Sequence, residues 1–400
     1  MRINKLYIKN IGPFKEAELE FANDFNTENG AQPVTIITGV NGAGKSIVID
    51  AIRAALSGQK LERHIVADDH DFQIKMEIDY DGTNRLVSTS KIENGTIGSA
   101  VDYSNLARFL LYGYKIPGLV YDWVIDYWSA NSPTDEFKIQ TMTNIKHELV
   151  FKDVMLGEKS NIQLVNFICQ MDYLRSSDMP SEKELGEVMY EKLKEVVNLC
   201  LDNGVFKYVR RTDLTPIVEQ NGIELSLEKL SSGNIFLLEH LLLFMQKMYS
   251  VSVLKKLPAN QIFKAAGLLL IDEIETHLHP KWQKKILGII RTLFPNIQII
   301  LTTHSPFVVA SMDGARIYTC VPRTGYSEIC DETEKYGRMP VEEILMSDVF
   351  GVHPFNDQIT EKIRTRKQLI ENGDMKGAQA IADELYEINP EYFSYLKGGW

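Results

Sequence analysis

The sequence predicts an α/β fold built on a mostly parallel β-sheet, and three observations support this prediction. Short apolar runs typical of strands buried on both faces occur at 34–38, 265–271 and 296–301. Apolar residues at helical spacing follow the first run, at 47–56, and an apolar helical segment precedes the second. This alternation of strand and helix is the pattern of a doubly wound sheet.

The N-terminal part predicts strands of a different kind. Residues 3–11 and 16–21 alternate apolar and polar side chains, and Gly12 and Pro13 separate them. Residues 72–80 and 85–92 alternate in the same way. We therefore expect an antiparallel β-subdomain beside the parallel sheet.

The domain order follows from changes in this patterning. Residues 1–102 are expected to form the first half of the main domain, and 103–204 a helical insertion without the sustained heptads of a coiled-coil arm. Residues 205–335 should complete the main domain, and 336–400 should form a helical C-terminal region.

Composition narrows the class of protein. The 400 residues, 44% hydrophobic and 24% charged, suit a globular chain with one large domain and a smaller addition. No stretch is apolar for long enough to cross a bilayer, and the first residues lack the apolar core of a secretory signal. We expect a cytoplasmic protein without membrane contact. The four dispersed cysteines indicate reduced thiols rather than disulfides or zinc ligands.

The net charge of −11 argues against nucleic-acid binding over the whole surface, because phosphate contacts need a local excess of Lys and Arg. Any nucleic-acid contact is expected at a local basic patch. The candidates are Lys207, Arg210 and Arg211, and Lys362, Arg364, Arg366 and Lys367. Each cluster fits a solvated surface better than a binding site.

Residues 39–46, GVNGAGKS, match the phosphate-binding pattern GxxxxGK[ST] between a predicted strand and a predicted helix. This loop is the signature of P-loop NTPases: its backbone N–H groups surround the phosphates, Lys45 reaches the β- and γ-phosphates, and Ser46 offers a hydroxyl to Mg²⁺. The expected cofactors are therefore ATP and Mg²⁺. The predicted nucleotide-binding residues here are Asn41, Gly42, Ala43, Gly44, Lys45 and Ser46.

The apolar run 268–271 delivers Asp272 and Glu273 to its C-terminal end, where α/β sheets bind ligands. Asp272 is the second predicted Mg²⁺ ligand beside Ser46. Glu273 is the predicted catalytic base that polarises the attacking water.

Two further segments distinguish among P-loop proteins. LSSGN at 230–234 resembles the ABC signature LSGGQ, and TTHSP at 302–306 resembles the histidine switch after the next strand. With all four motifs in the family's order, the chain resembles the ABC ATPases over residues 1–60 and 205–330. The resemblance implies an ABC-type head in which Lys45, Glu273 and His304 act in catalysis.

The resemblance also implies a dimer. In this family the signature residues, here Ser231 and Gly233, contact the γ-phosphate held by the opposite protomer, so a homodimer or higher even oligomer is expected. Ser232 and Asn234 depart from the family's Gly and Gln. Residues 275–277 fall at the family's D-loop, which crosses the dimer interface. The family's Q-loop glutamine stays unassigned, since neither Gln73 nor Gln140 has a persuasive context. The pair His277 and His279 fits this common string better than a metal site.

Within the family, IDEIETHLHPKWQ and LTTHSP resemble AAA-type ATPases of the RecF, SMC-head and OLD group. Chain length and the missing coiled-coil arm favour PtuA-like chains of Septu-type and retron-associated anti-phage systems. That resemblance implies a separately encoded effector such as an HNH nuclease.

The principal alternative is a RecF-like DNA-repair ATPase that acts directly on DNA. A transporter subunit is disfavoured by the long gap between Lys45 and Ser231. A nuclease domain within the chain is not expected, because the residues after the last predicted strand are too few for a Toprim domain and lack its acidic cluster.

Overall fold

The fold is seen in a computed structural model of the chain. It describes residues 1–25, 33–61, 63, 65–68, 71–80, 82–93, 96–101, 106–113, 121–131, 133–347, 349–351 and 355–396. By contacts the chain divides into two compact units, Met1–Val341 and Glu342–Trp400.

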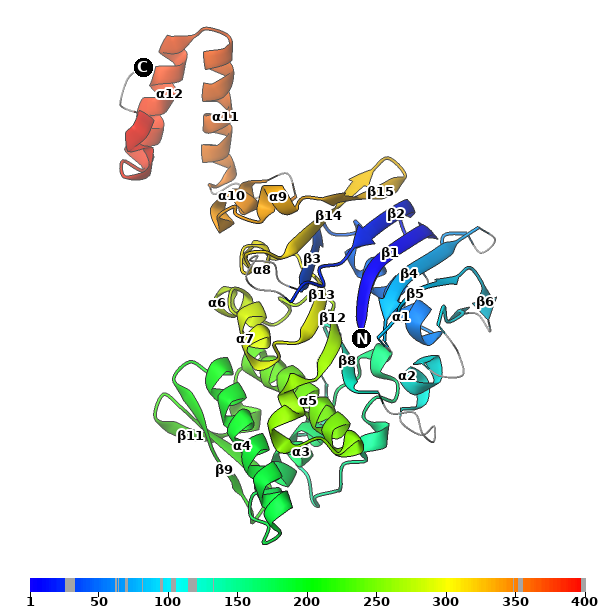
Figure 1. The fold of residues 1–400 in the computed structure, drawn as a ribbon. Coiled ribbons are helices and arrows are strands. Elements are labelled where there is room, and N and C mark those ends of the chain that lie inside the picture. Colours follow the sequence, from blue (N-terminus) through cyan, green and yellow to red (C-terminus); the bar gives the residue numbers. More distant parts are fainter. Residues whose placement is uncertain are drawn as a thin grey trace. The chain divides into compact units, whose positions relative to one another are not determined.

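The first unit is built around a mixed sheet with the strand order β15-β14-β3-β13-β12-β8 (Figure 1). Neighbouring strands from β14 to β8 are parallel, and β15 pairs antiparallel with β14 at one edge. The strand bounds are β3 (Val34–Gly39), β8 (Trp123–Trp128), β12 (Ala266–Ile271), β13 (Ile297–Thr302), β14 (Arg316–Arg323) and β15 (Tyr326–Asp331). β3, β8 and β13 are buried along their whole length, which explains their apolar sequences.

A second, antiparallel sheet has the order β2-β1-β4-β5, and the prediction of an antiparallel N-terminal subdomain is confirmed. Its strands are β1 (Arg2–Ile11), β2 (Phe14–Glu20), β4 (Gln73–Asp79) and β5 (Asn84–Thr89). A short hairpin follows, formed by β6 (Ile92–Glu93) and β7 (Thr96–Ile97). Buried and less buried residues alternate along β4, so one face of this sheet packs inward.

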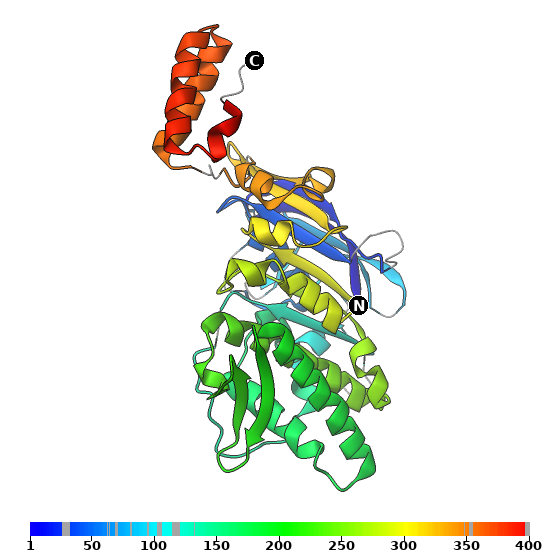
Figure 2. The same cartoon turned by 90° about the vertical axis from the view of Figure 1, so that its left-hand side faces the viewer.

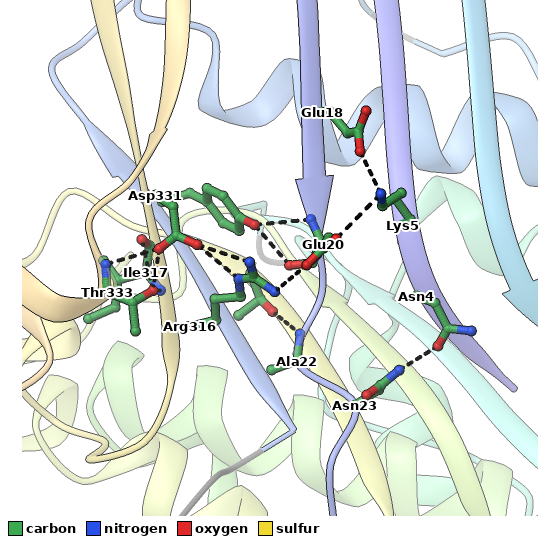
Figure 3. Close-up of polar contacts among 12 residues, drawn as sticks. Asn4, Lys5, Glu18, Glu20, Ala22, Asn23, Arg316, Ile317, Asp331 and Thr333 are labelled. Atoms are coloured by element: carbon green, nitrogen blue, oxygen red, sulfur yellow. Dashed lines mark hydrogen bonds and ion pairs between the residues drawn. The ribbon is translucent and has the colours of Figure 1, made fainter.

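Polar contacts join the two sheets at the β14–β15 edge (Figure 3). The Arg316 guanidinium lies 3.2 Å from a carboxylate oxygen of Glu20 and 3.0 Å from Asp331. The Tyr318 hydroxyl donates to the Glu20 carbonyl and accepts from the Glu20 N–H, both at 3.0 Å. Deeper inside, the buried amide of Gln298 on β13 pairs with the backbone of Ile3. The central sheet is therefore fixed against the N-terminal sheet by side chains that replace missing ladder bonds.

Helices cover the central sheet, and α3, α4 and the small sheet β11-β10-β9 form a cluster next to α5 and the β8 edge (Figures 1 and 2). The helices of this unit are α1 (Lys45–Ser57), α2 (Arg108–Tyr112), α3 (Asn161–Leu174), α4 (Pro180–Cys200), α5 (Ser232–Lys255), α6 (Pro280–Gln283), α7 (Ile286–Leu293), α8 (Pro306–Val309) and α9 (Thr333–Tyr336). The small sheet comprises β9 (Gly204–Arg210), β10 (Thr215–Gln220) and β11 (Ile223–Ser226). The 3₁₀ turns are η3 (His147–Leu149), η4 (Val154–Leu156), η5 (Leu227–Lys229) and η6 (Ala259–Lys264). α5 is buried nearly all round, and each buried Leu of such a helix contributes roughly 1.5–3 kcal/mol.

One sequence expectation is wrong inside the range 103–204. A helical pattern was expected throughout, yet Trp123–Trp128 is β8, the edge strand paired in parallel with β12. Its aromatic and β-branched residues suit a strand buried on both faces, and in such a strand the apolar run carries no two-residue period. The segments 103–105 and 114–120 of this range, and residue 132, lie outside the described residues. The domain boundaries themselves stay a prediction.

The second unit is helical, as expected for the C-terminal region. α11 (Asp357–Glu371) and α12 (Met375–Ile388) pack together as a hairpin, and η7 (Tyr392–Leu396) follows. Phe355, Ile359 and Ile381 pack against a small core of Ala382, Leu385 and Phe393. α10 (Val341–Met346) links the two units in sequence. Within the described part of the chain, no helix is long and apolar enough to cross a membrane.

Candidate functional site

The glycine loop joins β3 to α1 at the C-terminal edge of the central sheet. Gly42 and Gly44 have φ angles of 78° and 99°, which side-chain-bearing residues rarely adopt. A Cβ at Gly44 would also lie 2.6 Å from the ring of Pro13. The loop therefore requires glycine for its backbone path, and α1 begins directly after it, with its unpaired N–H groups at the loop.

Lys45 is buried at the base of this loop, with only 4% of its surface exposed. Its Nζ donates to the carbonyls of Gly39 and Val40, each at 3.0 Å. Burial lowers the pKa of Lys45, while the carboxylates of Glu275, Glu273 and Asp272 oppose that shift. The ammonium thus has neutral carbonyl partners, which a phosphate can replace at small cost.

Asp272 follows β12 and is 4% exposed. Its Oδ1 accepts from the Thr302 hydroxyl at 2.6 Å, and its Oδ2 lies 3.1 Å from the Arg63 guanidinium. Arg63 also lies 3.5 Å from Asp50 Oδ2 on α1. Thr302 therefore orients the Asp272 carboxylate, and Arg63 supplies a positive charge between the two acids. A hydroxyl from half-buried Ser46 and a carboxylate oxygen from Asp272 are the hard oxygen ligands that Mg²⁺ prefers.

Glu273 is half-buried and has a positive φ of 54°. Its N–H donates to Thr302 Oγ1 at 2.9 Å, which holds the strained turn in place. Glu273, Asp272 and Arg63 line a pocket of about 630 Å³, together with Tyr127 and the segment 129–131. The turn therefore sends the two adjacent carboxylates out of the strand into one pocket.

Glu275 anchors the loop that carries His304. Its carboxylate accepts from the Thr303 hydroxyl at 2.7 Å and from the His304 N–H. Burial raises the pKa of Glu275 and lowers that of His304, whose ring also bonds to the backbone of Gly39. Burial and the nearby Lys45 charge favour a neutral imidazole beside the glycine loop.

The signature segment begins α5. The Ser231 hydroxyl caps this helix by accepting from the Asn234 N–H at 3.3 Å. Ser231 and Ser232 are exposed, and a Cβ at Gly233 would lie 2.6 Å from the carbonyl oxygen of His277. Gly233 therefore allows close packing against the loop that follows Asp272 and Glu273 in the same chain. The expected contact with a second copy stays a prediction.

His277 and His279, which the sequence pattern does not favour as metal ligands, make contacts within the fold. The ring of His277 lies 5.8 Å from that of Phe236, and His279 caps α6 by accepting from the Lys281 N–H. Among the residues that the structure describes, no group of three or more His, Cys, Asp or Glu could hold a metal ion.

The first basic cluster is paired with acids. Lys207 pairs with Glu219, Arg210 with Asp213 and Arg211 with Asp172, at 2.6–3.0 Å. In the second cluster Lys362 pairs with Glu384, and Arg364 lies 3.9 Å from Glu361. These partners reduce the positive charge available to a phosphate backbone.

Sequence reasoning missed Arg63 and the end of β8. The Trp128 carbonyl accepts from the Asp272 N–H at 2.9 Å, so the segment after β8 lies beside the Asp272–Glu273 turn. Of the two glutamines considered for the Q-loop, Gln73 lies on β4 and Gln140 is exposed in a coil segment. The strand-like composition of 123–128, followed by Ser-Ala-Asn, was the available signal. For Arg63 no local pattern existed, since its role depends on two acids distant in sequence.

Two family models match the chain. Residues 5–177 match an AAA domain, and residues 157–310 match a model described as "AAA domain, putative AbiEii toxin, Type IV TA system". Together with the glycine loop, these matches make residues 5–310 similar to AAA-domain ATPases, a family that implies ATP binding.

Among characterised proteins, similar chains include probable ATPases of retrons and the Septu protein PtuA. The "Retron Ec83 probable ATPase" of Escherichia coli is 22% identical over 92% of this chain and 80% of its own length. "Septu protein PtuA" of Bacillus thuringiensis is 25% identical over 77% of this chain and 72% of its own. The "Retron Vc95 probable ATPase" of Vibrio cholerae is 35% identical, but over only 33% of this chain and 24% of its own length.

Solved structures with a similar fold include the SMC head domain from Thermotoga maritima, with a TM-score of 0.43, 16% identity and coverage of 83% of this chain and 99% of that one. The SMC head bound to the C-winged helix domain of ScpA gives a TM-score of 0.48 at 15% identity, over 87% of this chain and 100% of that one.

Proposed function

We propose that this chain binds and hydrolyses ATP at a site shared by two copies, and that the dimer controls a separately encoded effector in anti-phage defence. The observation that carries the ATPase part is the meeting of Lys45, Asp272, Glu273 and His304 at one edge of the central sheet. They come from the ends of β3, β12 and β13, which are neighbours in that sheet. Such an edge is where α/β sheets bind ligands.

Each residue has a distinct role in the proposed reaction. The N–H groups of the glycine loop and Lys45 bind the β- and γ-phosphates, and Ser46 and Asp272 hold Mg²⁺, which neutralises phosphate charge when bound. Glu273 accepts the proton of a water that attacks the γ-phosphorus, the bond to the β-phosphate oxygen breaks, and ADP leaves. Neutral His304 has one ring N–H, which is bonded to the Gly39 backbone, and on ATP binding this N–H is redirected to donate to the γ-phosphate.

The dimer is proposed from the position of the signature residues. Ser231 and Ser232 are exposed at the N-terminus of the 24-residue helix α5, whose dipole favours an anion. A second copy facing this surface would present its ATP γ-phosphate to Ser231 and Gly233. ATP would then join two heads, and hydrolysis would release them.

The effector is proposed from the relatives, since retron and Septu ATPases match most of this chain. An HNH nuclease is the partner we expect. The ion pairs of the first basic cluster favour this role over direct action on DNA.

The decisive experiment mixes two inactive variants. Lys45→Ala removes the phosphate lysine, and Ser231→Arg blocks the signature contact, so neither homodimer has a complete site. A mixed dimer has one intact composite site, formed by Lys45 of one copy and Ser231 of the other. We expect steady-state ATPase activity to return in the mixture after subunit exchange. If mass measurement confirms mixed dimers and their rate stays at the sum of the parents, the shared site is rejected.

A further inference from the structure

A second polar pocket, of about 410 Å³, lies between α5, the η3–η4 segment and the start of α3. It is separate from the glycine loop, and no sequence motif indicates it. Three ionisable side chains contributed by different elements meet in its wall: Asp126 from β8, Lys159 from the segment before α3, and Lys247 from α5.

These three side chains form a buried ionic cluster. Lys159 Nζ lies 3.0 and 2.9 Å from the two carboxylate oxygens of Asp126, and Lys247 Nζ lies 3.1 Å from Oδ1. The exposed fractions of the side chains are 1% for Asp126, 3% for Lys159 and 11% for Lys247. Burying charged groups to this extent is costly unless opposite charges balance.

The charges in this cluster do not balance. Burial opposes ionisation of Asp126, yet the two lysines hold its pKa below the ordinary value, so it carries one negative charge. Burial lowers the pKa of Lys247 to about 8, which leaves its ammonium mostly charged at neutral pH, and the two lysines contact a single carboxylate. The nearby acid Glu239 does not compensate, because burial raises its pKa to about 8 and keeps it protonated. The cluster therefore has an excess positive charge.

Both lysines also have ammonium N–H donors that their contacts with Asp126 do not use. An ammonium carries three N–H donors, and the contacts with Asp126 engage two of Lys159 and one of Lys247. The pocket wall around them is rich in amide side chains, namely Asn144, Gln163, Asn166 and Gln246. Exposed Lys146 and Lys152 lie at its rim, opposed there by Asp153 and Glu158.

The N-terminus of α3 does not supply this site, because the Asp135 carboxylate already occupies it. That carboxylate accepts from the N–H groups of Asn161 and Ile162, both at 3.1 Å. The positive charge that lacks an acidic partner is therefore that of the two lysines.

We propose that this pocket binds a small phosphate-bearing anion, which supplies the missing negative charge to Lys159 and Lys247. Compact, rotatable ammonium groups suit a phosphate, and the amide side chains can bond to the remaining oxygens. The ligand is small because the two lysine side chains are only 3% and 11% exposed, at a pocket of about 410 Å³. This site goes beyond the proposed ATPase function and does not depend on it.

The test uses the full chain with Lys45→Ala, which suppresses phosphate binding at the glycine loop. Thermal unfolding is followed against increasing sodium phosphate and, separately, sodium pyrophosphate, with ionic strength kept constant by NaCl. In this background Lys247→Met is compared with Lys255→Met, a matched change at an exposed position on the same helix.

We expect Tm to rise with either anion in the Lys45→Ala protein and in the Lys255→Met control, because ligands of the folded state stabilise it. Lys247→Met leaves a balanced Asp126–Lys159 pair, so its Tm without anion should be higher and should not respond to anion. The proposal fails if Lys45→Ala shows no anion response, or if Lys247→Met retains it. A response to a single-stranded oligonucleotide alone would also reject a small-anion site.

Discussion

The molecule buries lysines in two places and satisfies them in opposite ways. At the glycine loop, Lys45 donates to the neutral carbonyls of Gly39 and Val40, and the acids that act on its charge, Asp272, Glu273 and Glu275, lie after β12. In the second pocket, Lys159 and Lys247 contact the same carboxylate, Asp126. In the first arrangement a phosphate can replace the neutral partners of the charge. The second fixes the charges in place and leaves one of them uncompensated.

The two lysine sites also differ in how many elements of the fold they join. When a phosphate replaces a carbonyl as the partner of Lys45, no other helix or strand has to move. ATP can therefore bind at the loop without rearranging the sheet. Asp126 holds β8, α5 and the segment before α3 together, and β8 lies next to the Asp272 turn. The comparison therefore predicts that changes at Lys45 affect binding, whereas changes at Asp126 affect stability.

The largest expected effect is that of Lys45→Ala on nucleotide binding. The loss of its charge-assisted bonds to phosphate should weaken ATP binding at least ~100-fold, with little change in Tm of the nucleotide-free protein. Equilibrium binding of a fluorescent ATP analogue and thermal unfolding measure the two quantities. An unchanged affinity would refute the assignment of the glycine loop.

Glu273→Gln should lower kcat by about 100- to 1,000-fold while ATP still binds, because water loses its base but the phosphate contacts stay. Single-turnover hydrolysis and gel filtration with ATP test this, and a larger species trapped by ATP is expected. Turnover at the wild-type rate would show that another group activates the water. Glu275→Gln is an informative comparison, since that residue bonds to Thr303 and His304 instead.

Asp126→Asn should destabilise the fold by about 3–5 kcal/mol, because it leaves two buried ammoniums without their carboxylate. Urea unfolding gives the free energy directly. Glu158→Gln, an exposed acid at the rim of the same pocket, should change stability by less than ~0.5 kcal/mol. If the two changes lowered the free energy of unfolding equally, the buried cluster would stabilise the fold no more than an exposed acid does.

Glu239→Gln should stabilise the protein, and more so as pH rises. Burial raises the pKa of Glu239 to about 8, and neither carboxyl oxygen has a hydrogen-bond partner among the described residues. Between the ordinary pKa and about 8, the folded state holds a proton that the unfolded state releases, so wild-type stability falls with rising pH. The neutral amide removes this dependence. The gain should be at least ~1 kcal/mol larger at pH 8 than at pH 5. Urea unfolding at both pH values measures it, and a gain independent of pH would contradict the assignment.

The smallest effect is expected for Arg63→Ala. The Arg63 guanidinium competes with a cation for Asp272, but its side chain is 48% exposed, so its contribution is screened. The Mg²⁺ concentration for half-maximal ATPase activity should fall by up to about fivefold, with Arg63→Lys in between. A rise in the required Mg²⁺ would indicate that Arg63 supports cation binding.

The sequence alone determined the features that depend on local backbone chemistry. The path of residues 39–46 requires glycines at fixed spacing, and the short apolar runs at 266–271 and 297–302 suit buried strands of a parallel sheet. Hence the glycine loop, the Asp272–Glu273 turn and the α/β class followed from short segments. The roles assigned to those residues in ATP hydrolysis stay predictions.

The tertiary structure alone decided which distant residues meet. Trp123–Trp128 has an apolar pattern that suits a buried helix or a buried strand, and its pairing with β12 settles the choice. Arg63 gains significance only because α1 and β12 bring Asp50 and Asp272 to either side of it. In the same way Asp126, Lys159 and Lys247 are unremarkable in sequence, since the energy of a buried charge depends on its neighbours in space.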